Sequence, residues 1–180
     1  MGIVITISGE HGVGKSACAK LLAEIFNLRY ISSGEIFRRL AKEKGMSLEE
    51  FSSYVEDNPE IDRQIDEETI KVAKKGNVII DARLSAWMAQ EYADIKILLT
   101  APLEVRVRRL AKRDNKSYEE ALEETLAREK SEKERFKKIY NINIDDHSIF
   151  DVIINTELWS LDSIVKILKT VVEEYIASSS

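Results

Sequence analysis

The stretch Gly9–Ser16 reads GEHGVGKS and matches the pattern G-x-x-x-x-G-K-[ST] at every fixed position. Just before it, the segment 3–7 is a short apolar run rich in β-branched residues, which is typical of a strand buried on both faces. After it, apolar residues recur at helical spacing from Ala17 to Phe26. A strand, a glycine-rich loop and a helix in this order are the context in which the pattern binds phosphate.

The residue types of this loop, the P-loop, explain how it would hold a nucleoside triphosphate. Glycine adopts backbone conformations that are closed to other residues, so successive N–H groups can turn toward one anion. The helix that begins near Lys15 adds the positive end of its dipole. We expect Lys15 to reach the β- and γ-phosphates and the Ser16 hydroxyl to ligate Mg²⁺, whereas a plain glycine turn would leave this pair unexplained. The residues expected to bind the ATP phosphates here are Gly9, Glu10, His11, Gly12, Val13, Gly14, Lys15, Ser16 and Ala17.

Strands and helices alternate along the rest of the chain. Short apolar runs predict strands at 28–31, 78–81, 95–100 and 150–154, with helical segments between them and a closing amphipathic helix at 161–176. Ser47 and Ser117 open capping boxes, and Asn58 before Pro59 is a further helix start signal. Apolar strands that alternate with helices predict a five-stranded parallel sheet between two helical layers, the three-layer α/β/α sandwich of P-loop NTPases. The loops that follow the strands should then meet at one edge of the sheet, beside the P-loop.

Composition limits the class of protein and its partners. The chain has 180 residues, of which 44% are hydrophobic and 33% charged, as expected for one globular domain. Its net charge of −5 argues against broad nucleic-acid binding. No apolar run approaches the ~20 residues that span a bilayer, no signal peptide is visible, and a single cysteine suits a reducing compartment. We therefore expect a cytoplasmic protein with no membrane or nucleic-acid partner.

Two segments that follow strands carry candidate site residues. Asp81 ends a buried strand, where a carboxylate suits the Walker-B task of holding Mg²⁺ directly or through water; the alternative is an N-cap for the next helix. Arg83 lies two residues further on, and Arg38 lies on the helix after Ser33. Two arginines that converge on one phosphate would bind it bidentately, although either one alone is as compatible with a solvated surface position.

The segment from Arg106 to Arg135 is rich in arginine and poor in apolar residues. Arg128, Glu132 and Arg135 share one helical face, and there is hardly an apolar residue between positions 127 and 135, so core packing is not expected to hold this helix. It is either a solvated helix or a part that closes over a ligand, and opposite a P-loop we favour closure, which excludes water from phosphoryl transfer. The two histidines have no metal-ligand spacing, and for His11 the backbone is expected to matter more than the ring.

These motifs, in this order, resemble those of the nucleoside monophosphate kinases, and among them the archaeal-type cytidylate kinases. The resemblance covers nearly the whole chain and includes the segments SSGEIFR (32–38), SLEEF (47–51), NPEID (58–62), DAR (81–83), APLEVR (101–106) and residues 140–155. It implies ATP-dependent phosphorylation of CMP and dCMP by direct in-line transfer. It also implies a core (1–32, 76–105 and 148–180), an insert that binds the monophosphate (about 33–75) and an arginine-bearing lid (about 106–147).

The resemblance also implies roles for individual residues. Ser33, Arg38 and Arg83 would meet the monophosphate, and Asp62 and Arg63 would read its ribose or base. Arg109 and Arg113 would lie toward ATP. Arg128, Glu132 and Arg135 would lie between the two nucleotides. The residues expected to be catalytic are Lys15, Arg83, Arg128 and Arg135; those expected to bind the monophosphate are Ser33, Arg38, Asp62, Arg63, Arg83 and Glu132; those expected to hold Mg²⁺ are Ser16 and Asp81.

Two departures from the family pattern and several rival functions stay open at this point. Ala82 stands where the family usually has glycine, and Glu10-His11 stand where it has two prolines or other small residues. The nearest rivals are other small-acceptor P-loop kinases, of the adenylate kinase or dephospho-coenzyme A kinase type. A GTPase-type switch is disfavoured because neither N-K-x-D nor D-x-x-G follows the P-loop. A catalytically idle nucleotide-binding scaffold is the third alternative. A monomer is expected.

Overall fold

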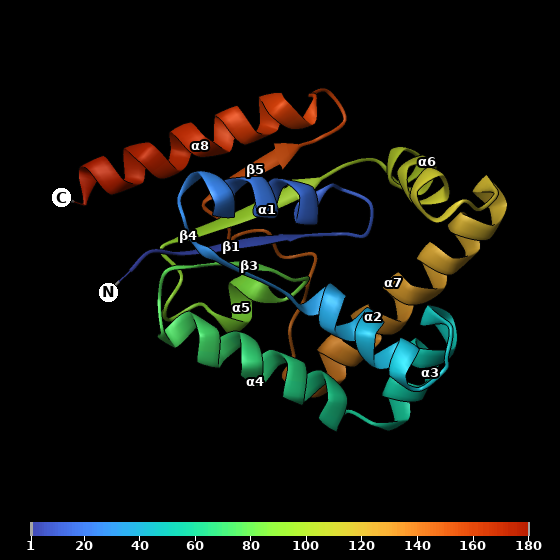
Figure 1. Cartoon of the computed structure of the whole chain (residues 1–180). Helices are drawn as coiled ribbons and strands as arrows, with labels where there is room; N and C mark the ends of the chain where they lie inside the picture. Colours follow the sequence, from blue (N-terminus) through green and yellow to red (C-terminus); the bar gives the residue numbers. More distant parts are fainter. Residues whose placement is uncertain (1, 180) are drawn as a thin grey trace.

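The computed structural model describes residues 2–179, and over this range its strands form one five-stranded sheet (Figure 1). Every neighbouring pair of strands is parallel, and the strand order is β2-β3-β1-β4-β5. The predicted parallel sheet is therefore confirmed: β3 and β4 have the predicted bounds, and the ends of the other three strands differ from the prediction by one or two residues. The strands are β1 (Val4–Gly9), β2 (Arg29–Ser32), β3 (Val78–Asp81), β4 (Ile95–Thr100) and β5 (Val152–Asn155).

Helices cover both faces of the sheet, which gives the three-layer sandwich. In Figure 1 α1 and α8 lie together over one face, while α4 and α5 lie over the other. None of the helices in the described part of the chain combines the length and apolar character that a bilayer-spanning segment needs. The helices are α1 (Lys15–Ile25), α2 (Ser33–Glu43), α3 (Leu48–Asp57), α4 (Glu60–Lys74), α5 (Ser85–Met88), α6 (Leu103–Asp114), α7 (Tyr118–Tyr140) and α8 (Leu161–Ser178).

The strands are apolar because both faces are covered. Every residue of β1 and β3 is buried. On one side Ile5 and Ile7 pack with residues of α1 and α8, including Leu22 and Leu168. On the other side Val4, Val78 and Ile80 pack with Ala73 of α4 and Ala89. Burial on both faces explains the continuous apolar runs that predicted these strands.

A third apolar cluster lies away from the sheet. Phe37 and Ala41 of α2, Phe51 and Val55 of α3 and Ile65 of α4 are buried together. The other end of α4 contributes Ala73 to the sheet, so α4 joins the two parts of the molecule. In Figure 1 α7 runs from α6 to the neighbourhood of α3, and it contacts both helices.

Local signals fixed most helix starts. Ser47 and Ser117 each accept a hydrogen bond from the backbone N–H three residues on, and both capping boxes are complete. A helix does begin at Asn58-Pro59 as predicted, but the Asn58 side chain does not cap it. The side-chain amide donates to the Tyr54 carbonyl of the preceding helix, and α4 begins after Pro59 with no side-chain cap.

Candidate active site

The P-loop connects β1 to α1 and is packed tightly against α6. Gly12 has a φ of 83°, and a Cβ atom there would lie 2.6 Å from the carbonyl oxygen of Arg106. Gly14 has a φ of 98° and precedes the first residue of α1, Lys15. Only glycine fits these two conformations without strain, so the glycines of the motif have the backbone role that the sequence predicts.

Lys15 lies over the loop that precedes it. Its Nζ donates to the carbonyl oxygens of Gly9 (2.7 Å) and Glu10 (2.9 Å). Burial lowers the pKa of Lys15 to about 8, because the surroundings disfavour the charged form. A phosphate group bound next to Lys15 would favour the charged form of its ammonium group again.

Asp81 accepts three hydrogen bonds on one carboxylate oxygen. Its Oδ2 lies 2.6 Å from Ser16 Oγ, 3.0 Å from the Tyr30 hydroxyl and 3.1 Å from Ser32 Oγ. The alternative role as an N-cap is excluded, since the N-cap of α5 is Leu84. A carboxylate beside the P-loop hydroxyl, with its second oxygen outside these bonds, fits a partly hydrated Mg²⁺, which usually takes one or two protein oxygens together with phosphate and water.

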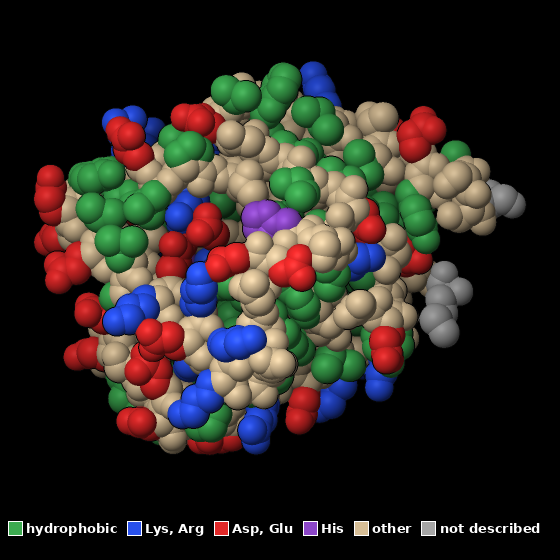
Figure 2. Space-filling model, turned by 180° about the vertical axis from the view of Figure 1, so that it is seen from behind, with side chains coloured by type: hydrophobic (Ala, Val, Ile, Leu, Met, Phe, Trp, Pro, Cys, Tyr) green, Lys and Arg blue, Asp and Glu red, His purple; other side chains and the backbone are tan. Residues whose placement is uncertain are grey.

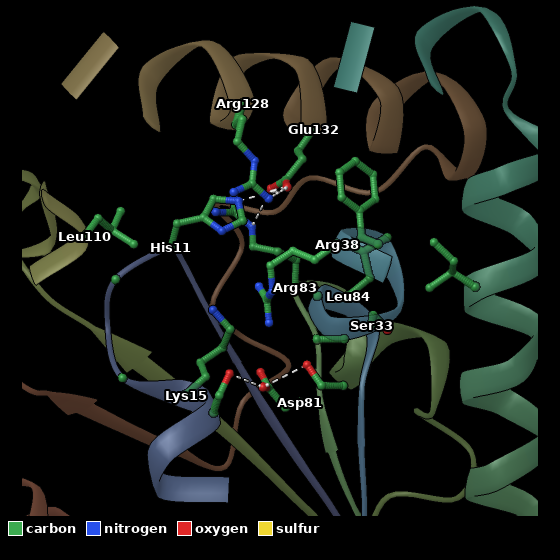
Figure 3. Close-up of a pocket in the computed structure, with 18 of the residues that line it drawn as sticks. His11, Lys15, Ser33, Arg38, Asp81, Arg83, Leu84, Leu110, Arg128 and Glu132 are labelled. Atoms are coloured by element: carbon green, nitrogen blue, oxygen red, sulfur yellow. Dashed lines mark hydrogen bonds and ion pairs between the residues drawn. The ribbon is translucent and has the colours of Figure 1, made fainter. Parts of the chain in front are cut away.

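One cavity of about 320 Å³ joins the P-loop to segments that are far away in the sequence. In Figure 3 Lys15 and Asp81 lie on one side of it, Arg128 and Glu132 lie on the other, and Arg83 projects between them. The cavity also reaches residues of α2, α4 and α6. The predicted site residues that line it are His11, Gly12, Gly14, Lys15, Ser16, Ala17, Ser33, Arg38, Asp62, Asp81, Arg83, Arg109, Arg113, Arg128, Glu132 and Arg135.

Four predicted residues do not line this cavity. Arg63 is exposed, because it follows Asp62 on α4 and one residue turns a helix by about 100°; the expectation that it reads the nucleoside is corrected. Val13 is a buried core residue, so only its backbone can serve a ligand. Gly9 and Glu10 line a neighbouring cavity of about 230 Å³ on the other side of Arg83.

Arg83 lies between two carboxylates of α7. Its guanidinium is 3.6 Å from Glu129 Oε1 and 3.5 Å from Glu132 Oε2, and Arg128 Nη2 is 3.8 Å from Glu132 Oε1. These distances are longer than hydrogen bonds. Accordingly Arg83 Nη1, Arg128 Nε and Glu132 Oε2 are buried without a hydrogen-bond partner. Unused guanidinium donors beside a P-loop are what an incoming phosphate group needs.

The face of α7 that carries these residues is buried, although it has hardly an apolar residue. Arg128, Glu132 and Arg135 are between 5% and 7% exposed. They are held by charge pairs instead of apolar contacts: Arg135 Nε, for example, lies 2.8 Å from Asp62 Oδ2. The polar run therefore forms one wall of the cavity.

His11 contributes its ring as well as its backbone, which corrects the sequence interpretation. His11 Nε2 lies 2.9 Å from Glu132 Oε1. Burial lowers the pKa of the imidazole to about 3, against the opposing effect of Glu132. Burial also opposes ionisation of Glu132, but His11, Arg83 and Arg128 outweigh it and hold the pKa of that carboxyl well below its usual range. The pair is thus a neutral imidazole that donates to a carboxylate.

Arg106 is a buried residue beside the P-loop that the sequence interpretation did not identify as part of the site. It is buried, and it donates to the carbonyl of His11 (3.1 Å) and to Glu129 (2.6 Å). Its Nε also lies 3.2 Å from Glu10 Oε2, so the P-loop carboxylate is neutralised and not left beside a triphosphate. The other two arginines on this face of α6 have different surroundings: Arg109 donates to Thr156 after β5 (2.9 Å), and Arg113 pairs with Asp114 and is exposed. Nothing in the sequence distinguishes Arg106 from these two residues.

Ala82 fits its turn without strain. It is 6% exposed, lines the cavity and does not have a positive φ. The methyl group at this position is therefore compatible with the fold.

Two acidic residues of α4 line the cavity. Asp62 pairs with Arg135, and Asp66, one turn later, accepts a hydrogen bond of 2.6 Å from the Tyr140 hydroxyl. Burial raises the pKa of Asp66 from 3.8 to about 7, and the neighbouring Asp62 adds to this effect. Asp66 was not among the predicted site residues, although its spacing from Asp62 puts both on one helical face.

The substitution Asp66→Asn should change how stability depends on pH. Between about pH 4 and pH 7 folded Asp66 retains its proton while the unfolded chain loses it, so the wild-type protein loses stability as the pH rises through this window. The full effect is about 4 kcal/mol at 1.36 kcal/mol per pKa unit. We expect denaturant unfolding to show the variant gaining stability over the wild type from pH 4 to pH 8, whereas Glu67→Gln on the exposed face should follow the wild-type curve.

Comparison with known proteins agrees with this geometry. A sequence model described as the cytidylate kinase-like family matches residues 4–158. A cytidylate kinase from Staphylothermus marinus is 47% identical over 174 residues, which cover 97% of this chain and 98% of that protein. A cytidylate kinase from Methanocaldococcus jannaschii is 44% identical over 174 residues, covering 95% of this chain and 98% of its own.

Solved structures support the fold independently of sequence. A shikimate kinase from Bacteroides thetaiotaomicron superimposes with a TM-score of 0.62 at 15% identity, covering 95% of this chain and 98% of its own. At that identity the likeness bears on the fold alone, which is that of the P-loop kinases. The match over nearly the whole chain, together with the P-loop and the arginine-lined cavity, shows that the protein belongs to the cytidylate kinase-like family.

Proposed function

We propose that this protein transfers the γ-phosphoryl group of ATP to CMP and dCMP, giving the diphosphates and ADP. The observation that carries the proposal is the single cavity that Lys15 of the P-loop shares with Arg38 and Arg83 from two other segments. The cytidylate kinases that match the whole chain support CMP as the acceptor.

The chain supplies alignment and charge in this mechanism. The P-loop amides and Lys15 bind the donor phosphates, with Arg109 and Arg113 at the α6 side of the cavity. Arg38 and Arg83 bind the acceptor phosphate, Ser33 lies beside it, and Arg128 and Arg135 complete the positive surroundings of the transferred group. Transfer is direct and in line, so the site needs no strong general base.

Ser16 and Asp81 are the residues that would hold Mg²⁺, directly or through water. When bound, the ion would offset the negative charge of the donor phosphates. In the free protein the Ser16–Asp81 hydrogen bond of 2.6 Å holds the two oxygens together.

Asp62 and Asp66 would face the nucleoside of the acceptor. Carboxylate and carboxyl groups in the cavity wall are suited to hydroxyl and amino hydrogens of a ribose or a base.

In this scheme residues 33–75 bind the monophosphate and residues 106–147 form the lid, with 1–32, 76–105 and 148–180 as the core. We propose a monomer that works in the cytoplasm. On the face shown in Figure 2 basic side chains lie interspersed with acidic ones, which does not favour a nucleic-acid partner.

A panel of acceptors with ATP and Mg²⁺ tests the proposal. CMP, dCMP, UMP, AMP, GMP and dephospho-coenzyme A would each be incubated with the protein, and ADP release would be measured in a coupled assay. We expect the highest kcat/KM with CMP and dCMP. Faster transfer to AMP or to dephospho-coenzyme A, or nucleotide hydrolysis without transfer to any acceptor, would contradict it.

Two adjacent arginines of α2 provide a matched pair of variants. Arg38 lines the cavity, whereas Arg39 is 67% exposed and lies 3.8 Å from Glu43. We expect Arg38→Ala to raise the KM for CMP by about 30-fold, the effect of losing a charge-assisted contact with phosphate of roughly 2 kcal/mol. Arg39→Ala removes the same charge from the same helix and should leave the KM values for CMP and for ATP unchanged. Equal effects of the two substitutions would show that only the net charge matters.

A further inference from the structure

The ring of His11 makes a contact that the P-loop motif does not require. The motif leaves this position open, yet the imidazole reaches across the cavity to α7, 121 residues away, and lies 2.9 Å from Glu132 Oε1 (Figure 3). The side chains of His11 and Glu132 are only 18% and 9% exposed. A buried hydrogen bond thus joins the donor-binding loop to the helix that carries Arg128.

This bond occupies one oxygen of the carboxylate and leaves the other without a hydrogen bond. The neutral imidazole donates from Nε2 to Oε1. Glu132 Oε2 is buried without a hydrogen-bond partner, and its nearest cation is Arg83 Nε at 3.5 Å. Glu132 therefore neutralises charge in the cavity without making a short bond to either arginine.

That arrangement is unusual for a carboxylate between two guanidinium groups. Such pairs normally form two short parallel hydrogen bonds, which use the donors of the arginine. Here the contacts of Glu132 with Arg83 and Arg128 are 3.5 Å and 3.8 Å long, and Arg83 Nη1 and Arg128 Nε keep unused donors. The contact that does have hydrogen-bond length is the one with His11.

We propose that His11 is a positioning residue: by holding Oε1 of Glu132, it prevents this carboxylate from pairing closely with Arg83 and Arg128, whose donors then remain available for the phosphate of the acceptor. The inference rests on the proposed function, because it assigns these donors to the monophosphate. It assigns a role to the side chain of His11, at a position where the P-loop motif requires no particular residue.

A purely local role for His11 makes a different prediction. If the ring only supported the P-loop, its loss would weaken the binding of ATP, and the effect would not depend on the charge at position 132. If it acts through Glu132, its loss should weaken the binding of the acceptor, and removing the carboxylate should abolish that effect. The KM values of the two substrates, together with a double-mutant cycle, separate the two roles.

The variants are His11→Ala, His11→Gln, Glu132→Gln and the double variant His11→Ala/Glu132→Gln. For each we would measure the KM of CMP and of ATP and, by calorimetry without ATP, the Kd of CMP; thermal unfolding shows that each is folded. We expect His11→Ala to raise the KM and Kd of CMP about tenfold, as for one lost charge-assisted hydrogen bond. The KM of ATP should change by less than about twofold. His11→Gln, which still offers an N–H donor, should restore most of the affinity.

In the Glu132→Gln background the same change at His11 should have no further effect on the Kd of CMP. The proposal is overturned if His11→Ala raises the KM of ATP more than that of CMP, if glutamine does not rescue, or if the effect persists without the carboxylate. Failure of the proposed function would look different, because the wild-type protein itself would then bind and phosphorylate no CMP.

Discussion

Lys15→Ala should lower kcat by about 10³-fold, in the range found when one preorganised donor to a developing charge is removed. In the structure Lys15 Nζ lies over the P-loop carbonyls of Gly9 and Glu10, at the wall of the cavity. An ammonium held there can follow the γ-phosphoryl group as it leaves ATP, and no other lysine lines this cavity in the part of the chain that the structure describes. Steady-state assays with saturating CMP and ATP measure the loss.

The fold should survive this substitution. A buried ammonium is costly to the folded protein, as the lowered pKa of Lys15 shows, so its removal should not lower the midpoint of thermal unfolding at neutral pH. Lys20→Ala is the matched control, since Lys20 lies on the same helix but is half exposed and pairs with Glu35. Near-normal turnover by Lys15→Ala would remove Lys15 from the mechanism.

Arg83→Ala should lower kcat/KM for CMP by about 10³-fold or more, comparable with the loss of an arginine that stabilises a transferred phosphoryl group. The side chain is 12% exposed and lies two residues after Asp81, so the turn that positions the carboxylate for Mg²⁺ also positions the guanidinium. Its Nη1 is buried without a hydrogen-bond partner in the free protein. This donor therefore has no protein partner to give up when it pairs with a phosphate group.

Arg83→Lys separates charge from shape. Lysine keeps the positive charge between Glu129 and Glu132, which alanine would remove, so the lysine variant should be the more stable of the two in thermal unfolding. It loses the planar fork, and we expect it to recover only a small part of the activity. Wild-type kcat/KM in the lysine variant would show that charge alone is sufficient at this position.

The sequence was most informative where local chemistry decides the structure. The strands β1 and β3 are buried on both faces, so their apolar runs mark them, and the capping boxes of Ser47 and Ser117 set helix starts within a single turn. Asn58 shows the limit of such signals, since the same amide can end one helix or begin the next. In the structure the Asn58 amide donates to the carbonyl of Tyr54 and so lies at the end of the preceding helix.

Long-range contacts account for what the sequence could not reveal. Helix α6 has four arginines, but only Arg106 is buried, because α6 presents it to the P-loop and to Glu129. The polar face of α7 resembles a solvated helix until Asp62 and His11 are placed opposite it. The contact between His11 and Glu132 joins residues so far apart that no local pattern predicts it.

The close approach of Gly12 to α6 has a consequence beyond the P-loop. A single added methyl group would meet the Arg106 backbone, which cannot rotate aside as a flexible side chain can, so the collision would be relieved only if the whole helix retreated. Arg106 would move with the helix, which would lengthen its hydrogen bond to Glu129. Because Glu129 also lies beside Arg83, the surroundings of Arg83 would change as well. One added carbon atom on the P-loop would thus disturb the part of the site that binds the phosphate acceptor.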